Sequence, residues 1–400
     1  MSELKALFDD LAATKSIFKD KSVLQSGHTP EIVPHREKQI EAIANILAPA
    51  LRGERASNLF LYGQTGTGKT LSIQFVRNEM LKRAGDSLRI EYLNCKLKKV
   101  ADTEYRILAQ LTKIFGGSVP ATGLPTEEVY NRFLEVINKQ NKLCIIIFDE
   151  IDQAVNKISD NFLYNLTRLN SELTNTQISI IGISNDLQFL DNLDPRVKSS
   201  LGEEEVVFHP YNALQLQEIL QQRAKSAFIE GILEEGVISK CAAFAAREHG
   251  DARRALDLMR IAGELAERDK KLKVGIDYVD KANSKMDKDK IIDTVEFAPR
   301  QLQLTLYSII LLYEKKRGVL FSGEIYQLYE ELCKKTKTEI LTQRRVGDLV
   351  GELEMLSLIN ADVVSRGRYG KTREITLRIQ QPILQKVKQL LSTALSLSDE

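Results

Sequence analysis

Residues 63–70 constrain the fold of this chain more than any other part of the sequence. They read GQTGTGKT and match the pattern G-x-x-x-x-G-K-[ST] at every fixed position. The apolar run NLFLY precedes them, and a helical pattern follows from about residue 70 to residue 83. In this strand–loop–helix context, backbone N–H groups and the helix start bind phosphate oxygens, and the lysine reaches the β- and γ-phosphates. The phosphate contacts are expected from Gly63, Gln64, Thr65, Gly66, Thr67, Gly68, Lys69 and Thr70.

Polar residues follow two further apolar runs, at the points where strands are expected to end. Asp149 and Glu150 come directly after LCIIIF, and Asn185 comes directly after QISIIGIS. Because the carboxyl ends of parallel strands face the ligand, Asp149 and Thr70 are expected to hold Mg²⁺. Glu150 is expected to polarise the attacking water, and Asn185 to sense the γ-phosphate or to position water. The alternative is that these polar residues only terminate their strands.

The base of the nucleotide is expected to be adenine. The sequence SNDL at residues 184–187 does not match the N-K-x-D signature of guanine-binding proteins. ATP and ADP are therefore the expected cofactors, together with Mg²⁺.

Predicted helices and strands divide the chain into three parts. Strands alternate with helices in the first part, which indicates an α/β fold with a mainly parallel sheet covered on both faces. These strands are expected at residues 58–62, 89–95, 143–148 and 177–184. Residues 213–283 show only helical patterns. From residue 301 the order is helix, helix, helix, strand, turn and strand, which is the order of a winged helix.

Composition excludes some classes of protein. Lys and Arg number 56 and Asp and Glu 55, so the net charge of +1 excludes a histone-like polycation but not a local basic patch. There is no run of about 18 apolar residues and no secretory signal at the start, so a cytoplasmic, nucleoid-associated protein is expected. The four cysteines lie far apart and are expected to be buried thiols.

Several motifs in order resemble one family. They are IIIFDEID at 145–152, GISND at 182–186, LDPRVKSSL at 193–201, FHPYNALQLQEIL at 208–220 and GDARRALDLMR at 250–260. Together with the phosphate loop and the C-terminal pattern, they resemble AAA+ ATPases, and more narrowly archaeal replication initiators related to the origin recognition complex and its helicase-loading relative. The resemblance implies an AAA+ P-loop core, a small α-helical lid and a C-terminal winged helix.

The resemblance also implies domain boundaries. The AAA+ nucleotide-binding domain is expected at residues 1–208, with a family-specific insertion at 96–140. The lid is expected at 209–285, a linker at 286–299 and the winged-helix domain at 300–400.

Further nucleotide-site residues follow from the resemblance alone. Arg253 in GDAR corresponds to a lid arginine that contacts the nucleotide. Arg196 in LDPR corresponds to a catalytic arginine that reaches a neighbour's γ-phosphate, and the alternative is a local salt bridge. The residues expected beside the adenine are Pro34, Arg36, Tyr211 and Ile219.

Two regions are expected to contact DNA. The third C-terminal helix begins with polar residues opposite an apolar face, as a recognition helix does, and a basic turn follows. Residues 334–373 hold nine basic and five acidic residues. In initiators of this family, the insertion forms a second DNA contact. The expected residues are Thr342, Gln343, Arg344, Arg345, Arg366, Arg368, Tyr369 and Lys371, with Thr122, Gly123 and Leu124 in the insertion. The alternatives are a protein-binding winged helix and a solvated helix pair.

The leading functional hypothesis is an ATP-binding initiator that binds duplex origin DNA and recruits or loads the replicative helicase. Hydrolysis of ATP would be slow and act as a switch, and paralogous initiators on neighbouring sites are further expected partners. Two alternatives remain open at this point: a clamp-loader-like AAA+ ATPase, and a winged-helix P-loop ATPase in transcription or signalling.

Overall fold

The computed structural model describes residues 16–25, 27–28, 30, 32–96, 103–120, 122–201, 203–316, 318–365, 371–379 and 381–397. The chain forms two compact units, Met1–Val279 and Asp280–Glu400, and each is described by itself.

A parallel five-stranded sheet forms the centre of the first unit. Its strands are β1 (Asn58–Gly63), β2 (Leu88–Asn94), β3 (Leu143–Asp149), β4 (Gln177–Ser184) and β5 (Glu203–Phe208). Their order is β2-β3-β4-β1-β5, and every pair is parallel. The four expected strands are confirmed. Strand β5 was not predicted: its segment EEEVVF is rich in acids, and among the described strands it pairs with β1 alone, at the edge of the sheet.

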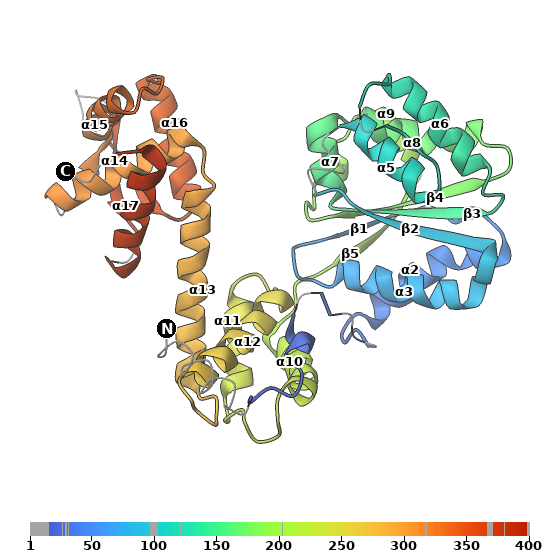
Figure 1. The fold of residues 1–400 in the computed structure, drawn as a ribbon, viewed down its shortest axis with the longest axis horizontal. Helices are drawn as coiled ribbons and strands as arrows, with labels where there is room; N and C mark the ends of the chain where they lie inside the picture. The colour runs from blue at the N-terminus through green and yellow to red at the C-terminus, as the bar shows by residue number, and fades with distance from the viewer. Residues whose placement is uncertain are drawn as a thin grey trace, which may run out of the picture. The chain divides into compact units, whose positions relative to one another are not determined.

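Helices cover both faces of this sheet (Figure 1). Alternate strand residues point to opposite faces, so Phe60 and Phe148 pack on one side and Leu59 and Ile147 on the other. One face is covered by α2 (Glu37–Leu47) and α3 (Lys69–Ala84). The other face is covered by α5 (Glu104–Ile114), α6 (Thr126–Asn138), α7 (Ile151–Ile158), α8 (Asn161–Glu172) and α9 (Pro195–Leu201). The result is a three-layer α/β arrangement with a core on each side of the sheet.

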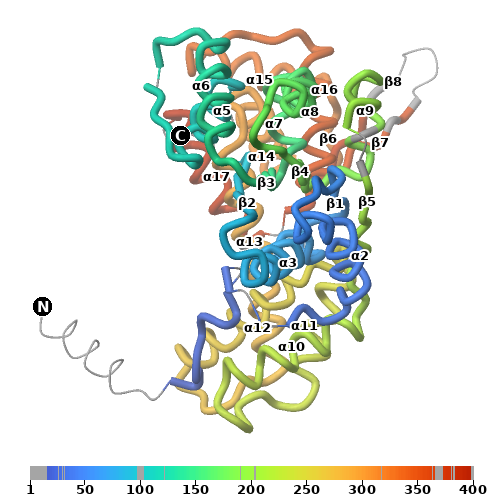
Figure 2. The backbone as a smooth tube through the Cα atoms, turned by 90° about the vertical axis from the view of Figure 1, so that its right-hand side faces the viewer, coloured from blue at the N-terminus to red at the C-terminus, as the bar shows by residue number. Residues whose placement is uncertain are grey.

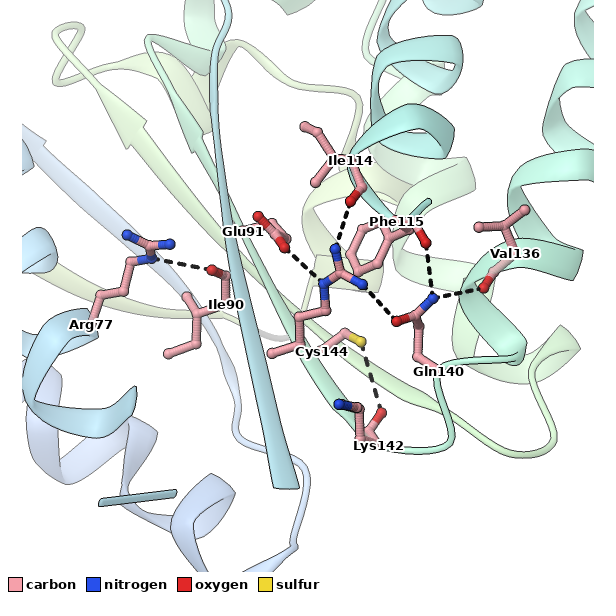
Figure 3. A network of polar contacts seen from close by, with 10 residues as sticks. Arg77, Ile90, Glu91, Ile114, Phe115, Val136, Gln140, Lys142 and Cys144 are labelled. Carbon is pink, nitrogen blue, oxygen red and sulfur yellow. Dashed lines mark hydrogen bonds and ion pairs between the residues drawn. The ribbon is translucent and has the colours of Figure 1, made fainter. Parts of the chain in front are cut away.

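A polar network fixes α5 and α6 to the edge strand β2 (Figure 3). The Arg89 guanidinium donates to the carbonyl of Ile114 and to the Gln140 side chain, and it pairs with Glu91. The Gln140 amide donates in turn to the carbonyls of Phe115 and Val136, both at 3.1 Å. These bonds join the carboxyl ends of both helices to the sheet, so the expected insertion has a fixed base.

A helical lid follows β5. It contains α10 (Ala213–Ala227), α11 (Val237–Arg247), α12 (Ala252–Arg268) and the start of α13 (Ile276–Glu296). The N-terminal segment that includes η1 (Lys21–Leu24) is fastened to this lid: the Phe18 and Phe228 rings lie 4.7 Å apart, and Lys21 pairs with Glu264 at 2.6 Å. The segment then continues toward α2 and the sheet.

The second unit is a winged helix. It contains α14 (Arg300–Lys316), β6 (Leu320–Phe321), α15 (Ser322–Lys335), α16 (Gln343–Met355), β7 (Ile359–Ser365), β8 (Lys371–Leu377) and α17 (Gln381–Leu395). β8 pairs antiparallel with both β6 and β7, and the β7–β8 hairpin is seen in Figure 2. The expected three helices and two strands are confirmed, whereas β6 and α17 were not foreseen.

Helix α13 runs through residue 296, so most of the segment expected as a linker is helical. The expected domain boundaries themselves stay predictions. All four cysteines are free and buried, as expected. In the part of the chain that the structure describes, no helix combines the length and the apolar character that crossing a membrane requires.

Candidate functional site

The phosphate loop joins β1 to α3 in a conformation that needs glycine. Gly68 takes a φ of +91° at the start of α3, and a methyl group there would lie 2.8 Å from the Tyr211 hydroxyl. Gly66 takes a φ of +73°, and a methyl group there would overlap the Asp251 carboxylate. Side chains other than glycine are strained at such φ values, so backbone strain and crowding select glycine at both positions.

The ammonium group of Lys69 lies among acceptors beneath this loop. Nζ donates to the carbonyls of Gly63 at 2.7 Å and Gln64 at 2.9 Å, and to Asn185 Oδ1 at 2.9 Å. Burial lowers the pKa of Lys69 to about 8; the charge of Asp149 opposes this effect, and that of Arg253 adds to it. The structure thus brings Lys69 and Asn185 together, although 116 positions separate them in the sequence.

Asp149 is 6% exposed at the end of β3. Its Oδ2 accepts from the Thr70 hydroxyl at 2.9 Å and from the Tyr92 hydroxyl at 2.6 Å, and its Oδ1 accepts from the backbone N–H of Glu150 at 3.0 Å. Burial, and then the bond to Asp149, raise the pKa of Tyr92. A carboxylate beside a hydroxyl is the oxygen donor set that Mg²⁺ prefers, with phosphates and water as further ligands. The residues expected to hold Mg²⁺ therefore fit that ion.

Glu150 turns the chain from β3 into α7. Its φ of +54° lies in the left-handed region, which non-glycine residues seldom adopt, and such strain concentrates at functional sites. Its Oε1 lies 3.7 Å from the ammonium of Lys96.

These groups line one pocket of about 860 Å³, within the size range of ligand sites. The expected residues in its lining are Thr65, Gly66, Thr67, Gly68, Lys69, Thr70, Asp149, Glu150, Asn185, Arg253, Pro34, Tyr211 and Ile219. Gly63, Gln64 and Arg36 are not part of the lining formed by the described residues. Lining residues that the sequence analysis missed include Val23, Gln25, His28, Tyr92, Asn94, Gln222, Arg223 and Ser226. They belong to no motif, so no local signal marked them.

Arg36 lies behind the phosphate loop. It is 3% exposed, and its guanidinium donates to the carbonyls of Thr67 at 2.7 Å and His209 at 2.6 Å. The same group lies 3.8 Å from the centre of the Tyr211 ring. Arg36 therefore links the phosphate loop to the chain that leads into the lid.

The start of α12 touches the phosphate loop as well. Asp251 caps this helix by accepting from the backbone N–H of Arg253 at 2.7 Å, and the N–H of Ala252 donates to the carbonyl of Gly66 at 3.2 Å. Through this contact the lid places Arg253 at the pocket.

Arg196 makes a local ion pair. Its side chain is 82% exposed, and its guanidinium binds both carboxylate oxygens of Asp194 at 3.1 and 3.0 Å. Its role toward a neighbouring molecule stays a prediction.

In the winged helix, the expected recognition residues Thr342, Gln343, Arg344 and Arg345 are all exposed at the start of α16. The Thr342 hydroxyl caps the helix by accepting from the N–H of Arg345. Arg373 of β8, which the sequence analysis missed, donates to the carbonyl of Gly347 at 2.7 Å and fixes the helix to the hairpin.

Not every expected DNA contact can be placed. Arg366, Arg368 and Tyr369 lie outside the described residues. Lys371 begins β8, but its side chain is likewise outside the description. Thr122 and Gly123 are exposed before α6, and Leu124 packs on the core. Their contacts with DNA stay predictions.

Comparison with known proteins agrees with this architecture. Three family models match: an AAA domain at residues 52–190, a Cdc6 AAA+ ATPase-type lid domain at 217–284 and a CDC6 C-terminal winged helix domain at 293–387. The ORC1-type DNA replication protein of Pyrococcus furiosus is 50% identical over 385 residues, covering 94% of this chain and 91% of that protein. The chain belongs to the ORC1-type DNA replication protein family.

Other members of the ORC1-type family are similar over comparable lengths. The ORC1-type DNA replication protein 1 of Methanosarcina acetivorans is 49% identical over 389 residues, covering 96% of this chain and 93% of that protein. The solved structure of the Aeropyrum pernix ORC1 protein in complex with DNA is 42% identical, with a TM-score of 0.83, and covers 95% of this chain and 97% of that chain. The AAA+ fold with a lid and a winged helix is confirmed, and nucleotide binding goes with that fold.

Proposed function

We propose that this chain is an ATP-binding initiator that binds duplex origin DNA and recruits or loads the replicative helicase. The observation that carries the proposal is the meeting of Lys69, Asp149 and Asn185 in one pocket, in a chain whose second unit is a winged helix. The DNA complex of the similar Aeropyrum ORC1 protein supports the DNA part of the proposal. Helicase recruitment rests on family membership alone.

The residues around the phosphates have distinct roles in this proposal. Lys69 binds the β- and γ-phosphates, and Thr70 with Asp149 holds the metal. When bound, Mg²⁺ would neutralise charge on the phosphates. Glu150 accepts a proton from the attacking water, and Asn185 orients the γ-phosphate.

Arg253 senses the γ-phosphate from the lid, while Pro34, Tyr211 and Ile219 pack beside the adenine. Loss of the γ-phosphate releases Arg253 and changes the lid angle, so that slow hydrolysis acts as a switch.

The exposed start of α16 is the proposed reader of DNA. Arginine can bind guanine, and glutamine adenine, with two hydrogen bonds each. Val346, Leu349 and Val350 are buried on the opposite face, so this face packs inward and leaves Gln343 and Arg344 accessible.

The experiment is a selection of genomic fragments by the purified protein in ADP and in ATP, at about 150 mM salt, where weak phosphate contacts are screened. We expect a few discrete sites, with footprints from the winged helix and from the insertion. Diffuse recovery in both nucleotides would contradict the origin-binding function. An enrichment of promoters, or ATPase stimulation by a sliding clamp, would favour the alternatives named above.

A further inference from the structure

Among the described residues, three donors bond to the Asp149 carboxylate, and one of them lies outside every motif. The Glu150 N–H and the Thr70 hydroxyl both belong to motifs that the sequence marks. The third donor is the Tyr92 hydroxyl, 2.6 Å from Oδ2. That distance lies in the range of charge-assisted O–H···O⁻ bonds, which are roughly twice as strong as neutral ones.

The pairing of β2 with β3 determines which residue reaches Asp149. Asn94 lies opposite Asp149, and Tyr92 lies opposite Ile147, two residues earlier on the same face. Two residues span about 7 Å along a strand, so a long side chain that leans toward the carboxyl end is needed to cover the gap. Tyrosine has that length and carries a donor at its tip.

The Tyr92 donor differs from the Thr70 donor because Tyr92 is not among the groups proposed to bind the metal. Thr70 and Asp149 are the groups proposed to bind the metal, so the bond between them must adjust when a metal arrives. Tyr92 is half-buried and comes from a different strand, which is fixed to α5 and α6 by the Arg89 network. The Tyr92 hydroxyl is therefore held on a fixed strand, and its hydrogen bond limits the movement of Asp149 Oδ2.

We propose that Tyr92 is a positioning residue for Mg²⁺, whose hydroxyl holds the Asp149 carboxylate in the orientation that binds the metal beside Thr70. The proposal rests on the proposed nucleotide-binding function. It implies that Tyr92 acts on the metal-dependent part of nucleotide affinity and not on the metal-free part. A tyrosine that only packs against the sheet would affect both parts equally or neither.

The test is the Tyr92→Phe variant, which removes one hydroxyl and keeps the ring. Binding of a fluorescent ADP is measured in EDTA and then over a titration of MgCl₂. We expect the affinity in EDTA to stay within about twofold of wild type, while the Mg²⁺ concentration needed for half of the metal-dependent gain rises about tenfold. Thermal unfolding in EDTA checks that the variant is folded.

Tyr130→Phe is the matched control. Its hydroxyl donates to Glu172 Oε1 at 3.0 Å, so the variant loses the same kind of bond outside the nucleotide pocket. It is expected to leave the Mg²⁺ titration unchanged. In an Asp149→Asn background, Tyr92→Phe is expected to have no further effect, because Tyr92 acts through that carboxylate.

The possible results distinguish a failure of the proposed role of Tyr92 from a failure of the proposed nucleotide-binding function. Wild-type protein that binds no ADP contradicts the proposed function itself. A second outcome is that Mg²⁺ raises the ADP affinity of the wild type, and that the Tyr92→Phe variant shows the same Mg²⁺ titration. This outcome overturns the role of Tyr92 and leaves the proposed function standing. A loss of affinity in EDTA as large as the loss in Mg²⁺ overturns the role of Tyr92 too, because it indicates a packing role.

Discussion

The lowered pKa of Lys69 makes nucleotide affinity depend on pH near about 8, below the usual lysine pKa of about 10.4. Burial lowers its pKa to about 8 in the nucleotide-free protein. The β-phosphate of a bound nucleotide requires the ammonium form of Lys69, so the pKa of Lys69 rises when the nucleotide binds. At a pH below the pKa of the nucleotide-free state, Lys69 is already protonated and the nucleotide affinity is at its maximum. Above it, each binding event must take up a proton, and affinity falls.

The size of the effect follows from the free-state pKa. If the bound form stays protonated, the association constant is reduced by a factor of one plus the ratio of neutral to charged lysine. For a pKa of about 8, that factor is about 1.1 at about pH 7 and about 11 at about pH 9. We therefore expect ADP affinity to fall about tenfold over that range.

Isothermal titration calorimetry in buffers of different ionisation enthalpy tests this reasoning. It measures the affinity and also the number of protons taken up, which should approach one per nucleotide at the alkaline end. Lys69→Arg is the control: the guanidinium stays charged throughout, so this variant should bind more weakly but with little pH dependence. A wild-type affinity that is flat up to about pH 9, without proton uptake, would refute the lowered pKa.

Three further substitutions test other parts of the structure. Gly66→Ala places a methyl group against the Asp251 carboxylate at a left-handed φ, so calorimetry should show an ADP affinity reduced by about tenfold or more. An affinity equal to that of the wild type would mean that the start of α12 is not held against the phosphate loop. Replacing Arg344 and Arg345 by alanine should weaken specific DNA binding by about 1–3 kcal/mol per lost base contact; an unchanged footprint would show that α16 is not the reader. Asn58→Ala leaves the N–H of Ile180 and the carbonyl of Leu201 without the Asn58 side chain as partner, so urea unfolding should show a free energy of unfolding lower by about 2–4 kcal/mol. A decrease below about 1 kcal/mol would contradict the cost assigned to these bonds.

An element of this fold can be predicted from the sequence when the residues that specify it are neighbours in the chain. The phosphate loop and β3 carry their structure in neighbouring residues, through glycines and an uninterrupted apolar run, and both were predicted. β5 was missed because its acids hide an edge strand, whose pairing with β1 is a long-range event. Helix α17 was missed although it supplies part of the winged-helix core.

The residues of the nucleotide site also divide into those with a local sequence signal and those without one. Lys69, Thr70 and Asp149 were predicted because motif spacing places each of them at the end of an element. Tyr92 has no such signal: only the register of β2 against β3 brings its hydroxyl to Asp149. Arg36 was expected beside the adenine, yet the structure places its guanidinium behind the loop, bound to backbone carbonyls that no pattern marks.

The sequence by itself determined the class of fold, the conformation of the phosphate loop and the identity of its ligand class. These depend on backbone freedom at glycine and on the period of apolar residues, which act over a few positions. Tertiary structure decided which atoms of distant residues meet: Asn185 Oδ1 with Lys69 Nζ, and the Tyr92 hydroxyl with Asp149 Oδ2. The physical reason is that hydrogen bonds need atoms within about 3 Å, and only strand register and helix packing set distances between residues far apart in the chain.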